Sequence, residues 1–262
     1  MRTLLLSLMG LIPLLLDGCG YRFGYRHFAG PILPVADQTT EMKVGDDRSI
    51  TFVLDRLEVR LRPITDDMLN RQFPHNSVSR ENLYQNPYVS PSNPYTYGDW
   101  KPPGQDRPPT RFTVFLLHVK NYAFPKVRVD PSNIQIVATN GRRYPSLSLE
   151  ALVEYYWPYA VGYAGNSYKQ FEERKDILRN TLFQGDVIFS GQEGQGYIVF
   201  PPLDHDVEEF TVQIEKMVLR FDYRDEPVEP LTSSIGSTER STWHRSHTRR
   251  RDRRERQSDS VD

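Results

Sequence analysis

The chain has few of the features that mark a secreted disulfide-bonded domain, a membrane-spanning protein or a nucleic-acid binder. Its 262 residues include one cysteine, Cys19, so no disulfide can form within the chain. Residues 4–16 are the one long apolar stretch, shorter than the roughly 20 residues that a membrane-spanning helix needs. The 33 basic and 34 acidic residues nearly cancel, which argues against a polyanion-binding protein. A folded domain must therefore be stabilised by its own hydrophobic core.

Signatures of catalysis are also missing, because neither Gly-x-Ser-x-Gly nor His-Glu-x-x-His occurs. The glycine-rich stretch 191–196 resembles a phosphate-binding loop in composition, but an apolar strand follows it instead of a helix, so we interpret it as a hairpin turn. His118 lies in an apolar strand and is interpreted as a core or rim residue. The sequence predicts no enzyme activity, no catalytic residue and no cofactor.

A metal site is weighed at Asp204-His205-Asp206, where two carboxylates flank an imidazole. Oxygen ligands at alternate positions suit a hard cation, and a histidine suits a transition metal. No further ligand set stands at a matching spacing. We therefore interpret these residues as a solvated loop and predict no metal.

The N-terminus has the organisation of a signal peptide, with Arg2 followed by the apolar stretch 4–16. The sequence Leu16-Asp17-Gly18-Cys19 resembles the lipobox of bacterial lipoproteins, although a charge such as Asp17 is unusual at that position. The resemblance implies that residues 1–18 are a signal peptide and that the Cys19 thiol receives a diacylglycerol. An ordinary secreted protein, an uncleaved membrane anchor and a buried N-terminal strand are the competing interpretations.

Lipidation would place the protein at a membrane of the cell envelope. Two or three acyl chains hold a protein firmly, whereas one chain holds it reversibly. Gly20 differs from the Asp that retains some lipoproteins in the inner membrane, so the resemblance favours the outer membrane if the cell has one. Residues 19–48 are expected to be a lipidated N-terminus and tether.

Residues 49–226 are predicted to form a β domain, since the chain has 20 prolines and 15 tyrosines and no fixed-period repeat. Ile50–Leu61 alternates, with a phase change at Asp55-Arg56 that we attribute to a β-bulge. The same shift recurs within Phe210–Tyr223. Residues 111–120 are expected to be a central strand, apolar on both faces, and Asn140-Gly141 a two-residue hairpin turn.

Two insertions interrupt the predicted strands. Thr65 and Ser79 are helix-start residues for two short helices. A long loop rich in tyrosine and proline follows at residues 84–109, and helical spacing predicts a helical insertion over residues 146–183. Residues 227–262 lack an apolar period, are rich in arginine, and are predicted to be a disordered tail that either docks on an anionic lipid or acidic protein or serves as a solubilising segment.

This order of features resembles the immunoglobulin-like domains of many bacterial lipoproteins. The resemblance rests on His118–Asn121 at a strand end, the hairpin at Asn140-Gly141 and the stretch Gly194–Phe200, and it covers residues 50–62, 110–145 and 186–224. It implies an antiparallel β-sandwich that contacts a protein or ligand in the envelope, and it supplies no catalytic residues.

The aromatic side chains of the loop are the candidate binding residues, because rigid rings suit a sugar or a protein groove at low entropic cost. They are Tyr84, Tyr88, Tyr95, Tyr97 and Trp100. The alternative is that these rings pack over the domain. The leading hypothesis is a non-enzymatic, lipid-anchored interaction or assembly module with an envelope protein as partner. The runner-up is a carbohydrate- or cell-wall-binding module, and nucleic acid is not expected as a partner.

Overall fold

The computed structural model describes residues 29–36, 38, 42–78, 91–101, 106, 108–162, 168–224, 226–228 and 239–247. In these residues the protein is mainly β, with two five-stranded sheets and one two-stranded sheet whose paired strands are antiparallel. The prediction of a mainly β, antiparallel fold is confirmed. Residues 29–247 form one unit, so the folded body extends beyond the predicted 49–226 at both ends.

The first sheet combines strands from both ends of the described chain, in the order β1-β12-β11-β7-β8. Its strands are β1 (Ala29–Pro34), β7 (Ile134–Ala138), β8 (Arg143–Pro145), β11 (Glu209–Ile214) and β12 (Glu239–His247). Strand β12 pairs with β1 on one side and with β11 on the other. The last described strand is therefore an interior strand of this sheet.

The second sheet has the order β10-β5-β4-β3-β2. Its strands are β2 (Met42–Val44), β3 (Ile50–Leu54), β4 (Leu57–Ile64), β5 (Thr113–Asn121) and β10 (Gln192–Phe200). In the separate two-stranded sheet, β6 (Lys126–Val127) pairs with β9 (Ile188–Phe189). Strand β5 has neighbours on both sides, as predicted for a central strand. Its Val114 and Phe115 lie on opposite faces and both are buried, which explains its continuous apolar sequence.

Four α-helices and one 3-10 turn complete the described structure. They are α2 (Asp66–Gln72), α3 (Pro74–Ser77), η3 (Pro131–Asn133), α4 (Leu149–Gly162) and α5 (Tyr168–Thr181). The Thr65 hydroxyl oxygen accepts a hydrogen bond from the Met68 N–H at 3.3 Å, so the predicted helix start at Thr65 is confirmed. Helices α4 and α5 confirm the predicted helical insertion. Ser79, the second predicted start, lies outside the described residues.

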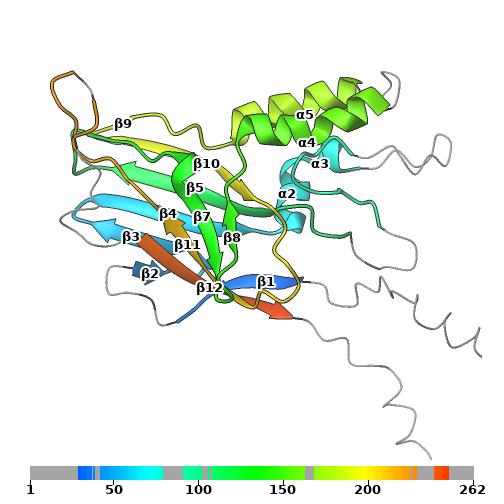
Figure 1. Cartoon of the computed structure of the whole chain (residues 1–262), viewed down its shortest axis with the longest axis horizontal. Coiled ribbons are helices and arrows are strands. Elements are labelled where there is room, and N and C mark those ends of the chain that lie inside the picture. Colours follow the sequence, from blue (N-terminus) through cyan, green and yellow to red (C-terminus); the bar gives the residue numbers. More distant parts are fainter. Residues whose placement is uncertain are drawn as a thin grey trace, which may run out of the picture. The chain divides into compact units, whose positions relative to one another are not determined.

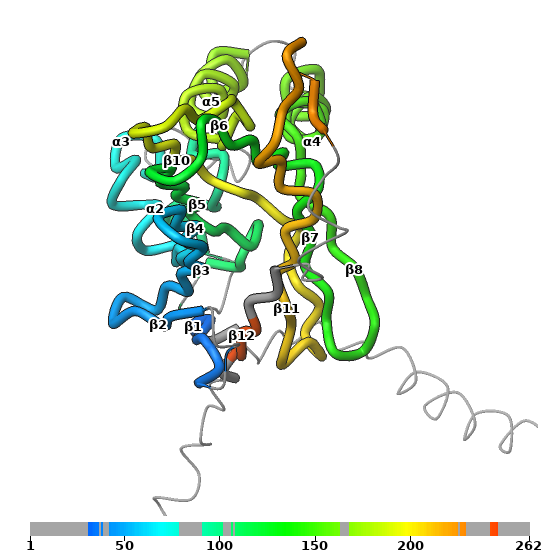
Figure 2. Tube along the Cα trace, turned by 90° about the vertical axis from the view of Figure 1, so that its left-hand side faces the viewer, coloured from blue at the N-terminus to red at the C-terminus, as the bar shows by residue number. Residues whose placement is uncertain are grey.

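Helices α4 and α5 lie at the end of the body opposite the β1–β12 pair. Figure 1 shows α4 and α5 side by side above strands β10 and β5, with β1 and β12 below the second sheet. Figure 2, turned by 90°, again has α4 and α5 at the top and β1 and β12 at the bottom. The separation therefore holds in both views.

Two hydrophobic cores hold these layers together. Between the sheets, the Phe115 ring on β5 contacts Trp243, Phe200 and Phe210, with ring centroids 5.2, 6.1 and 6.4 Å apart. The opposite face of β5 and β10 is covered by α2, α4 and α5, where Leu69, Val114, Leu152, Tyr156, Phe171, Leu178, Tyr197 and Val199 form the second core. Strands β5 and β10 are therefore buried on both faces where the helices cover them, whereas Glu58 and Arg60 of β4 remain 47% and 42% exposed.

The phase change at residues 55–56 is a hairpin and not the predicted β-bulge. Strands β3 and β4 pair across it, with Leu54 opposite Leu57 and Phe52 opposite Val59. Asp55 has φ 54°, the left-handed conformation that a tight two-residue turn demands. Paired residues across an antiparallel hairpin share one face, so the apolar parity must shift at the turn.

Other turns also differ from the predictions. At Asn140-Gly141 the hairpin is confirmed, but its loop has three residues, because Ala138 N–H donates to the Arg142 carbonyl and Gly141 has φ 84°. The predicted continuous strand Phe210–Tyr223 ends at Ile214, before Lys216 with φ 55°. The glycine-rich turn was predicted over residues 191–196, but the turn consists of Ser190 and Gly191, and residues 192–196 belong to β10.

Both predicted flexible ends contain strands. Within the expected tether 19–48, β1 and β2 pair with β12 and β3. Within the expected disordered tail 227–262, residues 239–247 form β12, and Trp243 is completely buried. Backbone hydrogen bonds to two neighbouring strands, together with one large buried ring, order this polar segment without an apolar period. The remainder of both ends lies largely outside the described residues.

Candidate functional site

Of the five predicted aromatic binding residues, the structure describes Tyr95, Tyr97 and Trp100. Tyr84 and Tyr88 lie outside the described residues. Tyr95 is completely buried, its hydroxyl is hydrogen-bonded to Thr181, and its ring lies edge-on to Tyr197 with centroids 5.2 Å apart. The Tyr95 ring is therefore part of the core and offers no face to solvent.

Among the loop residues that the structure describes, Tyr97 and Trp100 are the aromatic side chains that reach the surface. Both are partly exposed, and their ring centroids are 5.8 Å apart. Buried Asn93 holds the loop in place: its side-chain amide donates to Ser77 Oγ at 2.9 Å, and its side-chain oxygen accepts from the Tyr95 N–H at 3.0 Å. The two rings are thus presented by an ordered loop that contains neither helix nor strand over residues 91–101.

Helix α4 exposes larger fractions of its aromatic side chains than Tyr97 and Trp100 of the loop do. Its Leu152, Tyr156 and Ala160, four residues apart, form the buried stripe. Its outer faces carry Tyr155, Trp157, Tyr159 and Val161, with exposed fractions of 39%, 52%, 42% and 59%. The helix contains two glutamates and no basic residue. A surface helix normally has a polar outer face, so α4 is a candidate contact surface.

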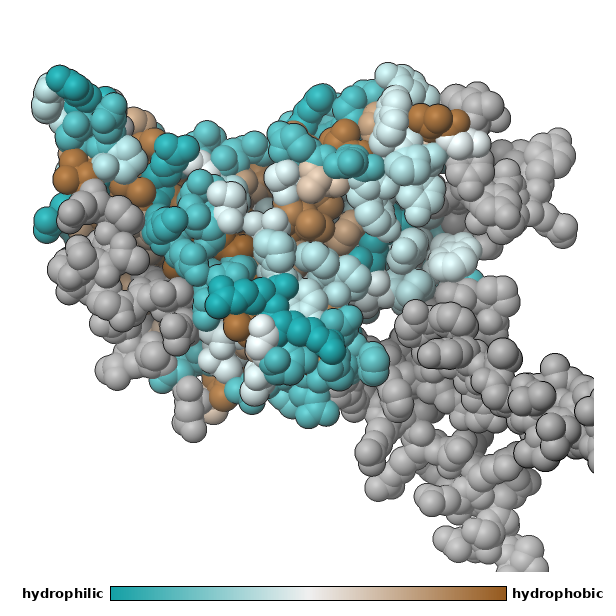
Figure 3. All heavy atoms as spheres, in the orientation of Figure 1, coloured by the Kyte–Doolittle hydropathy of each residue, from teal (hydrophilic) through white to brown (hydrophobic). Residues whose placement is uncertain are grey.

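The exposed rings of the loop and of helices α4 and α5 lie in two groups, one on each flank of α4. Tyr155 interacts with Tyr97 through its hydroxyl, and its ring lies 5.2 Å from Phe112 and 6.3 Å from Tyr159. On the other flank of α4, Trp157 contacts Phe171 at 5.6 Å, and Phe171 contacts the exposed Tyr168 of α5. We call Tyr97, Trp100, Tyr155, Trp157, Tyr159 and Tyr168 the aromatic surface. Figure 3 shows hydrophobic and intermediate residues between hydrophilic ones over α4 and α5.

Two buried arginines support the aromatic surface from below. The Arg111 guanidinium lies 4.0 Å from the Tyr97 ring centre and donates to the Tyr156 hydroxyl at 2.9 Å and to the Asn93 carbonyl at 3.2 Å. The Arg174 guanidinium lies 4.9 Å from the Tyr156 ring and donates to the Pro91 carbonyl at 2.8 Å. Cation–π contacts in a desolvated site contribute about 2 kcal/mol each. The arginines therefore join the loop to α4 and α5.

Burial also changes the acid–base chemistry beneath this surface. It raises the pKa of Tyr155 and of Tyr156, so both hydroxyls stay protonated at neutral pH. Burial raises the pKa of Asp66 to about 7, with Asp67 adding to the rise and Arg111 opposing it. The carboxyl group of Asp66 beneath the aromatic surface therefore titrates near neutral pH.

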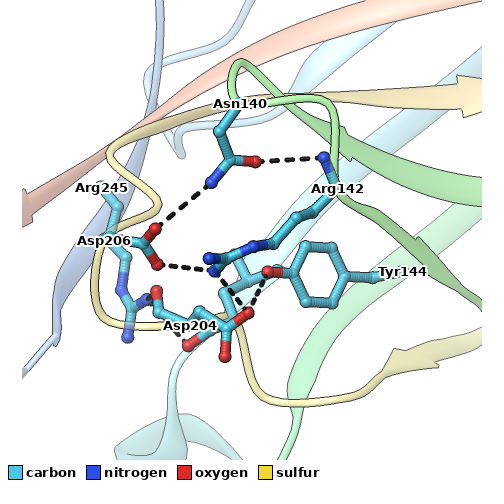
Figure 4. Close-up of polar contacts among 7 residues, drawn as sticks. Asn140, Arg142, Tyr144, Asp204, Asp206 and Arg245 are labelled. Atoms are coloured by element: carbon cyan, nitrogen blue, oxygen red, sulfur yellow. Dashed lines mark hydrogen bonds and ion pairs between the residues drawn. The ribbon is translucent and has the colours of Figure 1, made fainter.

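Asp204 and Asp206 take part in a separate polar cluster (Figure 4). Arg142 donates to both carboxylates at 2.8 Å, Tyr144 donates to Asp204 at 2.8 Å, and Arg245 donates to the Asp204 carbonyl at 3.0 Å. The carboxylates are thus engaged by an arginine and not arranged around a cation. Among the described residues, no group of three or more His, Cys, Asp or Glu side chains is placed to hold a metal ion.

His118 and the glycines of β10 have structural surroundings. The His118 imidazole lies 2.8 Å from the Glu193 carboxylate on the neighbouring strand. A Cβ at Gly196 would lie 2.5 Å from the Phe183 backbone, and one at Gly194 would lie 2.8 Å from Ile188. These glycines allow the segment after α5 to cross β10 closely.

The predicted site thus overlaps with the observed aromatic surface only in part. Tyr97 and Trp100 belong to it, whereas Tyr155, Trp157, Tyr159 and Tyr168 were not singled out from the sequence. The sequence did contain a pattern that indicates them, because residues 149–162 place apolar side chains on every face of the helix, whereas packing needs only one apolar stripe. The proposed lipidation residue, Cys19, lies outside the described residues.

In the part of the chain that the structure describes, no helix has the length and hydrophobicity needed to cross a membrane. Comparisons with protein-family models, curated proteins and solved structures find no match to this chain.

Proposed function

We propose that this protein is a lipid-anchored, non-enzymatic interaction module of the bacterial cell envelope. The support for the anchor is the sequence around Cys19, where an apolar stretch of signal-peptide length ends in Leu16-Asp17-Gly18-Cys19. Acyl chains on Cys19 tether the body to a membrane, the outer one in a cell with two.

The body serves as a rigid support for the contact surface. Two antiparallel sheets with a common core agree with the immunoglobulin-like class suggested by the sequence resemblance, and that finer class is part of the proposal. Helices α4 and α5 cover part of the outer face of β5 and β10 and carry most of the aromatic surface. A partner would therefore contact the helical layer and the adjoining loop.

The observation that carries the proposal is the exposure of Tyr155, Trp157 and Tyr159 on one helix that has no basic residue. Exposed aromatic residues that lie on a supported platform are typical of protein interfaces, where Tyr and Trp dominate the binding energy. The partner surface is expected to be apolar at its centre. Positive charge at its rim would complement Glu150 and Glu154 of α4.

The surface is tested by substitution of its exposed rings. The variant Trp157→Ala/Tyr159→Ala is compared with Lys169→Ala, whose side chain is 83% exposed on α5. Both are purified from detergent-solubilised envelopes under mild crosslinking. Specific loss of one protein partner in the double variant supports the proposal, and identical partner sets for both variants contradict it.

A glycan is the second candidate ligand, because Tyr97 and Trp100 form a supported ring pair of the kind that stacks on sugars. The same variants, together with Trp100→Ala, are tested for retention on cell-wall material. Loss of retention only with Trp100→Ala favours the glycan-binding alternative over the protein-binding one. Mass spectrometry of the mature N-terminus tests the anchor separately: an unmodified Cys19 contradicts lipidation.

A further inference from the structure

Four rings of the aromatic surface lie on the flank of α4 that faces the loop. Tyr97 and Trp100 come from the loop, with ring centroids 5.8 Å apart and ring planes inclined by 54°. Tyr155 and Tyr159 come from successive turns of α4, with centroids 6.3 Å apart and an inclination of 45°. A hydrogen bond between the Tyr97 and Tyr155 side chains joins the two pairs. We call these four residues the loop-side flank.

The loop-side flank is held in place before any ligand binds. The Arg111 guanidinium lies 4.0 Å from the Tyr97 ring centre, and the Phe112 ring lies edge-on to Tyr155 at 5.2 Å. Arg111 and Phe112 are themselves buried. Rings that are already fixed lose little freedom on binding, so more of the contact energy appears as affinity. Two inclined rings also leave a wedge between them, which suits a compact apolar group.

The loop-side flank offers hydrogen-bond donors but no strand edge. Three of its four residues are tyrosines, and burial raises the pKa of Tyr155, so its hydroxyl stays protonated at neutral pH. Residues 91–101 contain no strand, and the other wall of the flank is a helix. A peptide therefore has no exposed strand here to pair with, which excludes binding by strand addition. The flank suits an extended ligand with compact apolar groups and free carbonyl oxygens.

We propose that the loop-side flank binds a proline-rich segment of the partner protein in the polyproline II conformation. Proline rings are compact and apolar, and aromatic-lined grooves are the usual sites for such segments. A polyproline II backbone makes no internal hydrogen bonds, so its carbonyl oxygens can accept from tyrosine hydroxyls. Its conformation exists before binding, which lowers the entropic cost. This inference rests on the proposed function, because it names the kind of partner segment that the aromatic surface contacts.

Charge adds a preference for basic residues beside the prolines. Helix α4 contains Glu150 and Glu154 and no basic residue, and Glu154 is exposed directly before Tyr155. A neutral glycan is the competing ligand, because sugars also stack on rings and bond to hydroxyls. Glu154→Gln separates the two ligands: it should weaken binding of a basic proline-rich peptide and leave binding of a neutral glycan unchanged.

The test titrates the full chain against a labelled nonaproline peptide with an arginine at each end, followed by fluorescence anisotropy. We expect saturable binding. Tyr155→Ala/Tyr159→Ala should lower the affinity about tenfold or more. The matched control, Trp157→Ala/Tyr168→Ala, removes two rings from the other flank of α4 and should leave the affinity unchanged. Tyr155→Phe keeps the ring without the hydroxyl and should lower the affinity about two- to tenfold. Thermal unfolding verifies that each variant is folded.

Four results would overturn the inference. They are absence of saturable binding by the unsubstituted chain, equal affinity of the two double variants, equal binding of a control peptide with alternating alanine and glycine in place of proline, and binding of chitohexaose in place of the proline peptide. The last result would assign the flank to a glycan. Partner capture from envelopes is a separate measurement. If it identifies a protein partner that depends on the aromatic surface while the proline peptide does not bind, the proposed function stands and this inference fails.

Discussion

The guanidinium carbon of Arg111 lies 4.0 Å from the centre of the Tyr97 ring, in a position where Arg111 is only 5% exposed. A charged group so far from water is retained only if its hydrogen bonds and contacts offset the cost of desolvation. Arg111 joins the loop, through Asn93 and Tyr97, to helix α4, through Tyr156. The aromatic surface therefore depends on a residue that is itself hidden.

Arg111→Ala should destabilise the fold by about 2–4 kcal/mol, because it leaves a cavity and removes a donor from two buried oxygens. Denaturant unfolding measures this loss. Arg179→Ala, with a side chain that is 55% exposed, is the control and should change stability by about 0.5 kcal/mol or less. Equal stability of the two variants would show that Arg111 is not a structural link.

Trp243→Ala should cost about 3–5 kcal/mol, because this completely buried ring contacts Phe115 between the sheets. Trp157→Ala removes the same side chain at 52% exposure and should cost far less. Thermal unfolding of the two variants gives the comparison.

A chain ending at His247 should keep its stability, whereas one ending at Val228 should not, since it lacks β12. Equal stability of both truncations would contradict the position of β12 in the sheet.

Gly196→Ala should destabilise the protein by about 1–3 kcal/mol. Its new methyl group would lie 2.5 Å from the backbone of Phe183, which cannot move without disturbing the segment that crosses β10. Gly162→Ala is the matched control, because a Cβ there meets no atom within 4 Å. Urea midpoints of both variants test this expectation, and a stable Gly196→Ala protein would contradict the close crossing.

The unfolding free energy should fall as the pH rises from about 4 to 7. An unfolded aspartate has a pKa of about 3.9, while burial raises that of Asp66 to about 7. Between these values the folded protein holds a proton that the unfolded chain has released, so raising the pH favours unfolding. Asp66→Asn should flatten this part of the pH profile and stabilise the protein above it. An unchanged profile in urea titrations would exclude Asp66 as the titrating group.

Local patterns along the chain predicted several elements well. Thr65 identifies a helix start because its hydroxyl satisfies an N–H only three residues away. Val114–Leu117 identifies a strand buried on two faces, and the spacing of Leu152 and Tyr156 identifies a helix. In each case the determining contacts lie within a few residues or repeat with the period of the element.

The candidate surface was less predictable. The abundance of aromatic residues in the loop was evident, but whether a ring packs inward, as Tyr95 does, or outward, as Trp100 does, depends on what lies beneath it. Buried Arg111 lies two residues after the loop and just before β5, whereas buried Arg174 lies on α5, far from the loop in sequence. Their meeting at Tyr156 is a property of the packed structure.

The sequence by itself determined the strand and helix periods, the absence of disulfides and the signal-like N-terminus with Cys19. Only the tertiary structure decided that a polar segment with one tryptophan becomes the interior strand β12, and that its end lies opposite Ala29. The physical reason is how far apart the interacting residues lie along the chain. Helix caps and apolar periods depend on neighbours in the chain, whereas the pairing of β1 with β12 joins backbone segments more than 200 residues apart, as the pairing of Leu33 with His244 shows.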